Sequence, residues 1–214
     1  MMEEFLKELR TKVWRTAGAR YDAARRLKRR EIVSTISLAF FSALTVVLAF
    51  VQRVYLQQGG TAFDNYLTAL SACLGIFLLA ISLIEWGAGA GSKAEALHRN
   101  AEDLTALQIR IWQRISEMES GKGGTWSDVD DLRTEYERIK ERCTANHDPL
   151  DDKNFLAHNR MAPEFLDKDE NPKIGFVESY WISSRNFMAS LWYFAVFWLL
   201  ILIALWNIPW PTSK

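Results

Sequence analysis

Five residues between positions 147 and 158 have side chains that bind metals or transfer protons: His147, Asp148, Asp151, Asp152 and His158. Closed zinc sites and calcium-binding loops place their ligands at characteristic short intervals, and this spacing matches neither. The sequence also offers no serine or cysteine nucleophile near a base, no phosphate loop and no paired-carboxylate site. These residue types therefore predict a protein that is not an enzyme and that needs no metal or cofactor.

Three glycines at alternate positions, Gly87, Gly89 and Gly91, lie in the stretch LIEWGAGAGSKAE. A Walker loop needs Gly-Lys-Ser/Thr at a fixed offset, and a dinucleotide-binding turn needs GxGxxG after a strand, so neither motif is present. Glycine inside a helix costs about 1 kcal/mol relative to alanine. The stretch is therefore deformable, and the sequence leaves two readings open, close helix packing or a gating hinge.

Glu85 closes an apolar run just before these glycines. Ionisable groups inside a membrane are costly and often functional, but a carboxylate near the membrane edge can reach water. Two further readings are a salt bridge to an arginine of the N-terminal region and a negatively charged ring at a pore mouth. All three stay open at the level of sequence.

Three segments of the 214-residue chain carry no charged side chain, namely 32–51, 66–84 and 186–213. A helix needs roughly 20 apolar residues to cross the hydrocarbon core of a bilayer, so each segment is long enough to span it. Basic and acidic residues number 26 each, and this balance gives no indication of nucleic-acid binding. We expect an all-α integral membrane protein with three transmembrane helices.

The helical parts follow from residue periodicity. We expect a basic amphipathic helix at 1–31, transmembrane helices 1 and 2 at 32–91, a cytoplasmic antiparallel helical hairpin at 92–145, an irregular cytoplasmic linker at 146–185 and transmembrane helix 3 at 186–210. The hairpin seams step by three and four residues around a GKGG turn, and Ser127 and Asp130 are the expected cap of the second helix. The apolar face of each hairpin helix packs either against the other hairpin helix or against another subunit.

Hydroxyl side chains distinguish the first two spans from the third, which is bulky and aromatic. Small and hydroxylated faces let helices approach closely in lipid, so we expect spans one and two to face protein and span three to face lipid. Trp206 and Trp210 are expected at the outer headgroup level, with Tyr180, Trp181 and Trp192 nearer the inner one. The pore-facing candidates are Ser34, Ser37, Ser42, Thr45, Ser71, Ser82 and Glu85.

Basic residues near the ends of spans predict the orientation of a membrane protein. Six precede the first span, whereas the following loop offers only Arg53, so we expect the N-terminus and residues 92–185 in the cytoplasm and the C-terminus outside. The first reading is that the basic residues meet anionic lipid headgroups; a lipid-sensing or partner-binding role is the alternative. These membrane-surface candidates are Arg20, Arg25, Arg26, Lys28, Arg29 and Arg30.

Three stretches resemble a known group, the SLATT families of SMODS- and SLOG-associated two-transmembrane effector domains. The first is RTAGARYDAARRLKRREIVSTISLAFFSA, the second LHRNAEDLTALQIRI after span two, and the third ANHDPLDDKNF. The third is similar to an Asn-His-x-x-x-Asp element of a branch found beside reverse transcriptases. The resemblance covers roughly residues 10 to 205, and none of its motifs is catalytic.

The resemblance implies a membrane effector of a bacterial anti-phage (abortive infection) system, located in the inner membrane, that oligomerises to form a pore or disrupt the membrane when a sensor partner activates it. The implied partners are the lipid bilayer, further copies of the chain, and a nucleotide-messenger synthase or reverse transcriptase system; direct nucleic-acid binding is not expected. The alternative function is a non-conducting membrane-anchored scaffold whose hairpin recruits a soluble partner.

Overall fold

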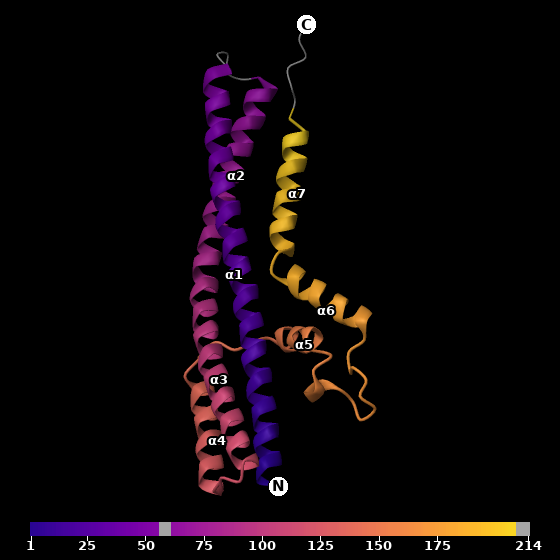
Figure 1. Ribbon diagram of the computed structural model, residues 1–214. Coiled ribbons are helices and arrows are strands. Elements are labelled where there is room, and N and C mark those ends of the chain that lie inside the picture. The colour runs from indigo at the N-terminus through magenta and orange to yellow at the C-terminus, as the bar shows by residue number, and fades with distance from the viewer. Residues whose placement is uncertain (56–60, 209–214) are drawn as a thin grey trace. The chain divides into compact units, whose positions relative to one another are not determined.

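Helices form the architecture of the protein. The structure, a computed structural model, describes residues 1–55 and 61–208. Within those residues every named element is helical, in agreement with the predicted all-α class. The elements are α1 Met2–Tyr55, α2 Ala62–Ala88, α3 Ala90–Glu119, α4 Trp126–Glu141, α5 Pro149–His158, the 3-10 helix η1 Pro163–Phe165, α6 Phe176–Ala189 and α7 Trp192–Trp206 (Figure 1).

The chain divides into two compact units, which we describe separately. The bundle unit comprises Met1–Lys28 and Gly91–Ala189, and the span unit comprises Arg29–Ala90 and Ser190–Lys214. Helix α1 contributes its first half to the bundle unit and its second half to the span unit. The sequence predicts a boundary after residue 31, but α1 is unbroken there because no glycine or proline interrupts residues 19–55.

The core of the bundle unit forms where α1, α3 and α4 meet. Most of its buried positions follow the predicted helical spacing, and Ala17 and Leu107 are additions to it. The seams therefore pack against each other and against α1. The buried residues of this cluster are Leu6, Leu9, Val13, Ala17, Leu104, Leu107, Ile111, Ile115, Val129, Tyr136 and Ile139.

The cap of α4 differs from the prediction by two residues. Thr125 accepts a hydrogen bond from the backbone of Asp128, and Asp128 accepts one from the backbone of Thr125, so these residues form the capping box. The predicted cap at Ser127 and Asp130 is wrong because the helix already begins at Trp126.

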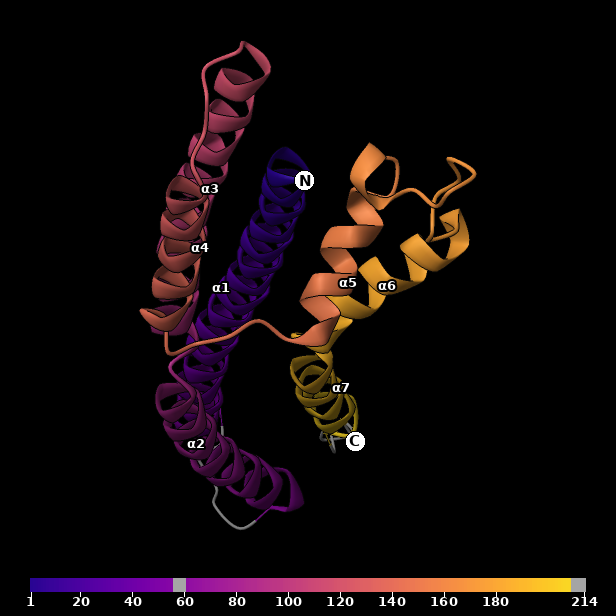
Figure 2. The same cartoon turned by 90° about the horizontal axis from the view of Figure 1, so that it is seen from below.

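The segment predicted as an irregular linker contains α5, η1 and α6. Pro149 stands in the first turn of α5, where its missing N–H costs nothing, and Asp148 precedes it as the N-cap. Helices α5 and α6 pack against each other (Figure 2). A short helix opened by proline lacks the long periodic pattern by which helices are recognised, and this explains why the prediction missed it.

An aromatic contact holds α5 and η1 against α1. Trp14 stacks on Phe165 with ring centroids 5.0 Å apart and meets Phe155 edge-on at 5.5 Å. A Cβ atom at Gly18 would overlap the Phe155 ring, so glycine is what allows α5 to approach α1 here. Helix α1 therefore packs on one side against the hairpin and on another against α5.

The span unit contains residues 29–55 of α1 together with α2 and α7. Leu48, Leu67 and Leu74 form its buried cluster, and Ile201 of α7 packs against it. Two helical stretches, Met2–Val54 and Ala62–Glu119, each contain a window apolar enough to cross a membrane, and α6 with α7 gives a third if that pair is counted as one span.

The third predicted span differs from the structure in two ways. The predicted segment 186–210 is interrupted at Ser190 and Leu191, so its first residues belong to α6; Trp210 lies outside the described residues. The span expected to face lipid also contacts protein, since the Trp198 Nε1 donates to Ser37 at 3.0 Å and the Tyr66 hydroxyl donates to the Ala204 carbonyl at 2.7 Å, while Leu199 and Leu202 stay exposed.

Candidate functional site

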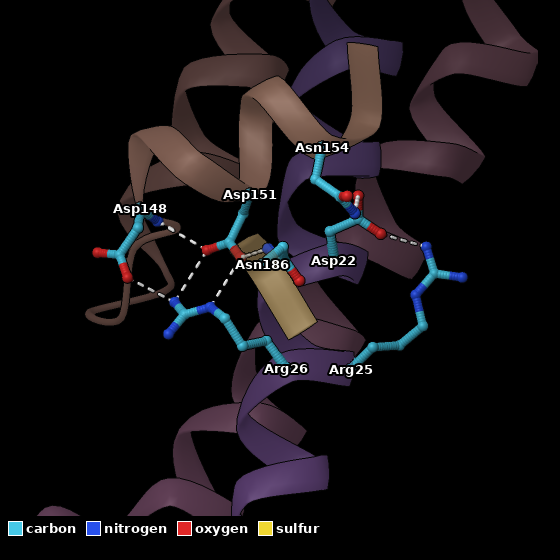
Figure 3. Close-up of polar contacts among 7 residues, drawn as sticks. All are labelled: Asp22, Arg25, Arg26, Asp148, Asp151, Asn154 and Asn186. Carbon is cyan, nitrogen blue, oxygen red and sulfur yellow. Dashed lines mark hydrogen bonds and ion pairs between the residues drawn. The ribbon is translucent and has the colours of Figure 1, made fainter. Parts of the chain in front are cut away.

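A buried polar cluster joins α1 to α5 and α6 inside the bundle unit (Figure 3). It contains residues from three helices that are far apart in the sequence, and we call it the Asp151 cluster. Its members are Asp22, Arg25, Arg26, Asp148, Asp151, Asn154 and Asn186.

Arg26 and Asp151 form the centre of the cluster. The Arg26 Nε donates to Asp151 Oδ1 at 2.8 Å and its Nη2 to Oδ2 at 2.9 Å, which is a bidentate pair. The same Nη2 also contacts Asp148 Oδ2 at 2.5 Å. Asp151 is completely buried, whereas Asp148 is 63% exposed, so the two carboxylates lie in very different surroundings.

Asp151 also receives hydrogen bonds from outside α1. The backbone N–H of Asp148 donates to its Oδ2 at 2.9 Å, and the Asn186 Nδ2 of α6 donates to its Oδ1 at 3.1 Å. A single buried carboxylate therefore links Arg26 of α1, the first turn of α5 and the last turn of α6. The hydrogen bonds that Arg26 donates to Asp151, followed by the carboxylate's charge, raise the pKa of Arg26, and the guanidinium stays protonated.

Asp22 is the second buried carboxylate, one turn before Arg26 on α1. It accepts a hydrogen bond from Asn154 Nδ2 at 2.8 Å and pairs with Arg25, whose side chain is largely exposed. Buried charges are tolerated only when they are paired, and removing one partner of such a pair is strongly destabilising. The cluster can thus hold α5 and α6 against α1.

Arg20 and His147 lie near each other beside this cluster. Arg20 is 4% exposed, and its Nε and Nη1 find no hydrogen-bond partner among the described residues; the same holds for the Nδ1 of His147. Burial lowers the pKa of Arg20. Burial, and then the charge of Arg20, lowers the pKa of His147, so its imidazole stays neutral near pH 7.

The six basic residues expected at the membrane surface have different environments in the structure. Arg20 is buried in the bundle unit, Arg25 and Arg26 belong to the Asp151 cluster, and Arg30 pairs with Glu85 in the span unit. Lys28 is exposed. Both Lys28 and Arg29 interact with other residues and are not free. Lipid binding by this group stays a prediction.

Glu85 has the salt bridge that was one of its three predicted roles. Its Oε1 accepts from Arg30 Nη2 at 2.8 Å and from the Tyr193 hydroxyl of α7, and its side chain is 10% exposed. The Arg30 guanidinium also lies 5.4 Å from the Tyr193 ring centroid. These contacts connect α1, α2 and α7 within the span unit.

The hydroxyl groups proposed to face a pore do not share one environment. Ser34 and Ser37 are buried, Ser42 and Ser82 are exposed, and Thr45 and Ser71 are intermediate. Ser37 is occupied by the hydrogen bond from Trp198, whereas the buried Oγ of Ser71 has no partner among the described residues. Ser42 and Ser82 are therefore the two serine candidates free to face a neighbouring molecule or a channel.

The glycine stretch separates two helices. Gly89 adopts a left-handed conformation with φ of 57°, and its N–H donates to the Trp86 carbonyl at 3.3 Å, so it caps α2. Helix α3 begins at the next residue, Ala90. A Cβ at Gly87 would meet nothing within 4 Å, which is contrary to the close-packing reading at that position.

Sequence reasoning did not identify Asp22, Asn154 or Asn186 as functional residues. Two of them fall within the stretches that carry the family resemblance, Asp22 in the first and Asn154 in the third, but the resemblance assigned them no role. Among residues 1–55 and 61–208, no group of three or more His, Cys, Asp or Glu side chains is arranged to hold a metal ion. Both Cys73 and Cys143 are free thiols.

Comparison with known proteins gives one result. Residues 2–208 match the family model described as SMODS and SLOG-associating 2TM effector domain family 5. No curated protein and no solved structure matches the chain significantly.

Proposed function

The chain belongs to the SMODS and SLOG-associating 2TM effector domain family 5, and we propose that it is a non-enzymatic effector that permeabilises the bacterial inner membrane during phage infection. In this proposal a sensor partner acts on the bundle unit, copies of the chain assemble, and the assembled span units form a pore or disrupt the bilayer. The association with the reverse-transcriptase branch stays a prediction.

The observation that carries the proposal is the continuity of α1. Its residues Leu6, Leu9 and Val13 are part of the bundle core, and its residues 29–55 are part of the span unit, with no break between them. A displacement of the bundle core would therefore be transmitted along one helix into the span unit. The Asp151 cluster, which fixes α5 and α6 to the same helix, is a suitable point for a partner to act.

Assembly is part of the proposal because one chain offers few membrane helices. Two or at most three helical stretches of the described residues qualify as spans. The exposed apolar side chain of Val46 on the membrane part of α1 and the exposed hydroxyl of Ser42, one turn apart, leave surface available for neighbouring copies. In lipid, small and hydroxylated residues favour such helix contacts.

The test is the membrane potential of cells that express the full chain together with its neighbouring genes, followed with a voltage-sensitive dye during infection. We expect depolarisation before growth stops. Ser42→Trp is expected to abolish it by filling the proposed channel face, whereas Val47→Trp, on another side of α1, is the matched control and is expected to depolarise normally. An unchanged membrane potential during growth arrest would overturn the proposal of a pore.

A scaffold function is the second candidate, and a separate observation favours it. Ile109 and Trp112 of α3 are 58% and 57% exposed although they belong to the bundle unit. Large exposed apolar side chains on a polar helix mark protein interaction sites. If the chain is a scaffold, the double variant Ile109→Asp, Trp112→Asp is expected to abolish growth arrest. Ser42→Trp is then expected to leave growth arrest intact.

The orientation proposed for the chain has the N-terminus and residues 92–185 in the cytoplasm. A cysteine placed at Ser127 of the full chain, in a background without Cys73 and Cys143, reports on it. We expect no reaction with a membrane-impermeant maleimide in intact spheroplasts and full reaction after lysis. Labelling in intact spheroplasts would show that residues 92–185 lie outside the cytoplasm.

A further inference from the structure

Helix α6 has its polar and apolar faces reversed relative to a helix of a water-soluble protein. Its buried position is Asn186, and Ser179 lies on the same side. Its exposed side carries six large apolar side chains that cover an arc of roughly 140° at 100° per residue. These are Phe176 at 73%, Val177 at 79%, Tyr180 at 72%, Trp181 at 72%, Phe187 at 50% and Met188 at 52% exposure.

Hydrogen bonds fix this orientation. The Ser179 hydroxyl donates to the Ala157 carbonyl of α5 at 3.0 Å, and Asn186 donates to the buried Asp151. Rotating α6 to hide its aromatic residues would break both contacts and leave Asp151 with one donor fewer. The apolar arc is therefore held outward by the Asp151 cluster.

The residue types of the arc suit the boundary between lipid headgroups and acyl chains. Tyrosine and tryptophan concentrate there because their rings are apolar and their O–H and N–H groups are polar. A helix that lies in the membrane plane buries its apolar face by roughly 5–10 Å and keeps its charged residues toward water. Glu178 and Arg185, which are exposed beyond the edge of the arc, satisfy that second condition.

The position of α6 in the chain favours the same partner. Only Ser190 and Leu191 separate it from α7, which consists entirely of apolar residues from Trp192 to Trp206. One helix built from α6 and α7 would be about 46 Å long at 1.5 Å per residue, which exceeds the hydrocarbon core of roughly 30 Å, so about 16 Å of it would project from the membrane and place the aromatic side chains of α6 in water. The break before Trp192 avoids this.

We propose that α6 is a membrane-surface helix whose aromatic arc inserts into the cytoplasmic headgroup region, and that the third span consists of α7 and its flanking residues only. The aromatic arc thus contacts the lipid bilayer and not a second copy of the chain. The inference holds for the pore and the scaffold function alike.

The experiment measures the depth of single spin labels on α6 in the full-length protein, reconstituted in lipid vesicles. Cys73 and Cys143 are first replaced, and labelled cysteines are then placed at Val177, Trp181 and Met188 of the arc and at Glu178 and Arg185 as matched controls on the same helix. Accessibility to oxygen, which partitions into lipid, is compared with accessibility to a water-soluble nickel chelate.

We expect the oxygen-to-nickel accessibility ratio to be several-fold higher at the three arc positions than at the two controls. Equal nickel accessibility at Val177 and Glu178 would overturn the proposal, because the arc would then face water. Low accessibility to both reagents at the arc, with spin–spin broadening, would also overturn it by showing that a second copy covers the arc. The helix carries mixed charge, so the ratio is expected to be the same in zwitterionic and in anionic vesicles.

Discussion

At the scale of single residues, the buried carboxylate of Asp151 is the centre of the bundle unit's polar contacts. It accepts from a guanidinium, an amide side chain and a backbone N–H that come from α1, α6 and α5 respectively. Because Asp151 is fully buried, these contacts are shielded from the solvent screening that weakens ion pairs on the surface.

The Asp151→Asn variant tests how much this carboxylate contributes. It keeps the side chain's shape but leaves the largely buried Arg26 cation without its bidentate partner, and we expect a loss of about 3 kcal/mol in unfolding free energy. Denaturant unfolding of the full chain in detergent gives the measurement.

Asp148→Asn is the matched control for that change. Asp148 contacts the same guanidinium but is 63% exposed, and asparagine caps a helix as well as aspartate does. A loss of about 0–1 kcal/mol is expected. Equal losses for the two variants would mean that burial of Asp151 is not what makes the pair important.

His147 gives the bundle unit a pH dependence. Burial lowers its pKa below the ordinary 6.5, so at slightly acidic pH the unfolded chain takes up a proton that the folded chain does not. The folded state therefore loses stability as the pH falls through about 6.5 toward the lowered value, and it is most stable above that window. The facing charges are Arg20, Asp148, Asp151 and Asp152.

Thermal unfolding of the full chain at pH 8 and pH 6 measures this effect. We expect His147→Gln to reduce the drop in melting temperature between the two conditions. His98→Gln, at an exposed ring, serves as the control and is expected to leave the drop unchanged. If both variants show the wild-type drop, His147 does not carry the dependence.

At the scale of elements, α1 requires a small residue where α5 crosses it. Gly18→Ala would place a methyl group in the Phe155 ring, which Trp14 and Phe165 hold in place, so we expect a destabilisation of about 1–3 kcal/mol. Unfolding of the detergent-solubilised chain measures it.

Gly87→Ala in α2 is the counterpart of that substitution. No atom lies within 4 Å of the added carbon, and alanine favours a helix by up to about 1 kcal/mol, so this variant is expected to be as stable as the wild type or more so. A destabilised Gly87→Ala would indicate that the glycine stretch packs against something in the assembled state.

At the scale of the whole molecule, the proposed effector function uses two of the three chain connections between the units, α1 and the α2–α3 junction. Gly89 gives that junction its left-handed residue, which alanine adopts at a cost of about 1 kcal/mol or more. Replacing Gly87, Gly89 and Gly91 together with alanine is expected to favour one continuous helix from α2 into α3.

The triple variant is expected to assemble normally but to block activation, measured as growth arrest after infection and as oligomer size in detergent. Gly75→Ala, at an open position within α2, is the control with unchanged activity. Full activity of the triple variant would show that the glycines are not a hinge.

The helical class, the membrane segments and most core positions of the bundle unit could be predicted from the sequence. Helix periodicity and hydropathy are local properties, so Leu97, Leu104, Ile111 and Tyr136 could be recognised as buried without knowing their partners. The same local rules misplaced the α4 cap and missed α5, because short helices carry little periodic signal.

Only the tertiary structure decided what the polar residues do. Arg26 and Asp151 are 125 residues apart, and nothing in either local pattern distinguishes a buried ion pair from two solvated charges. The outward direction of the α6 aromatic arc likewise depends on Asn186 reaching Asp151. Charged and amide side chains acquire their role from the partner that burial gives them, and that partner is a property of the fold.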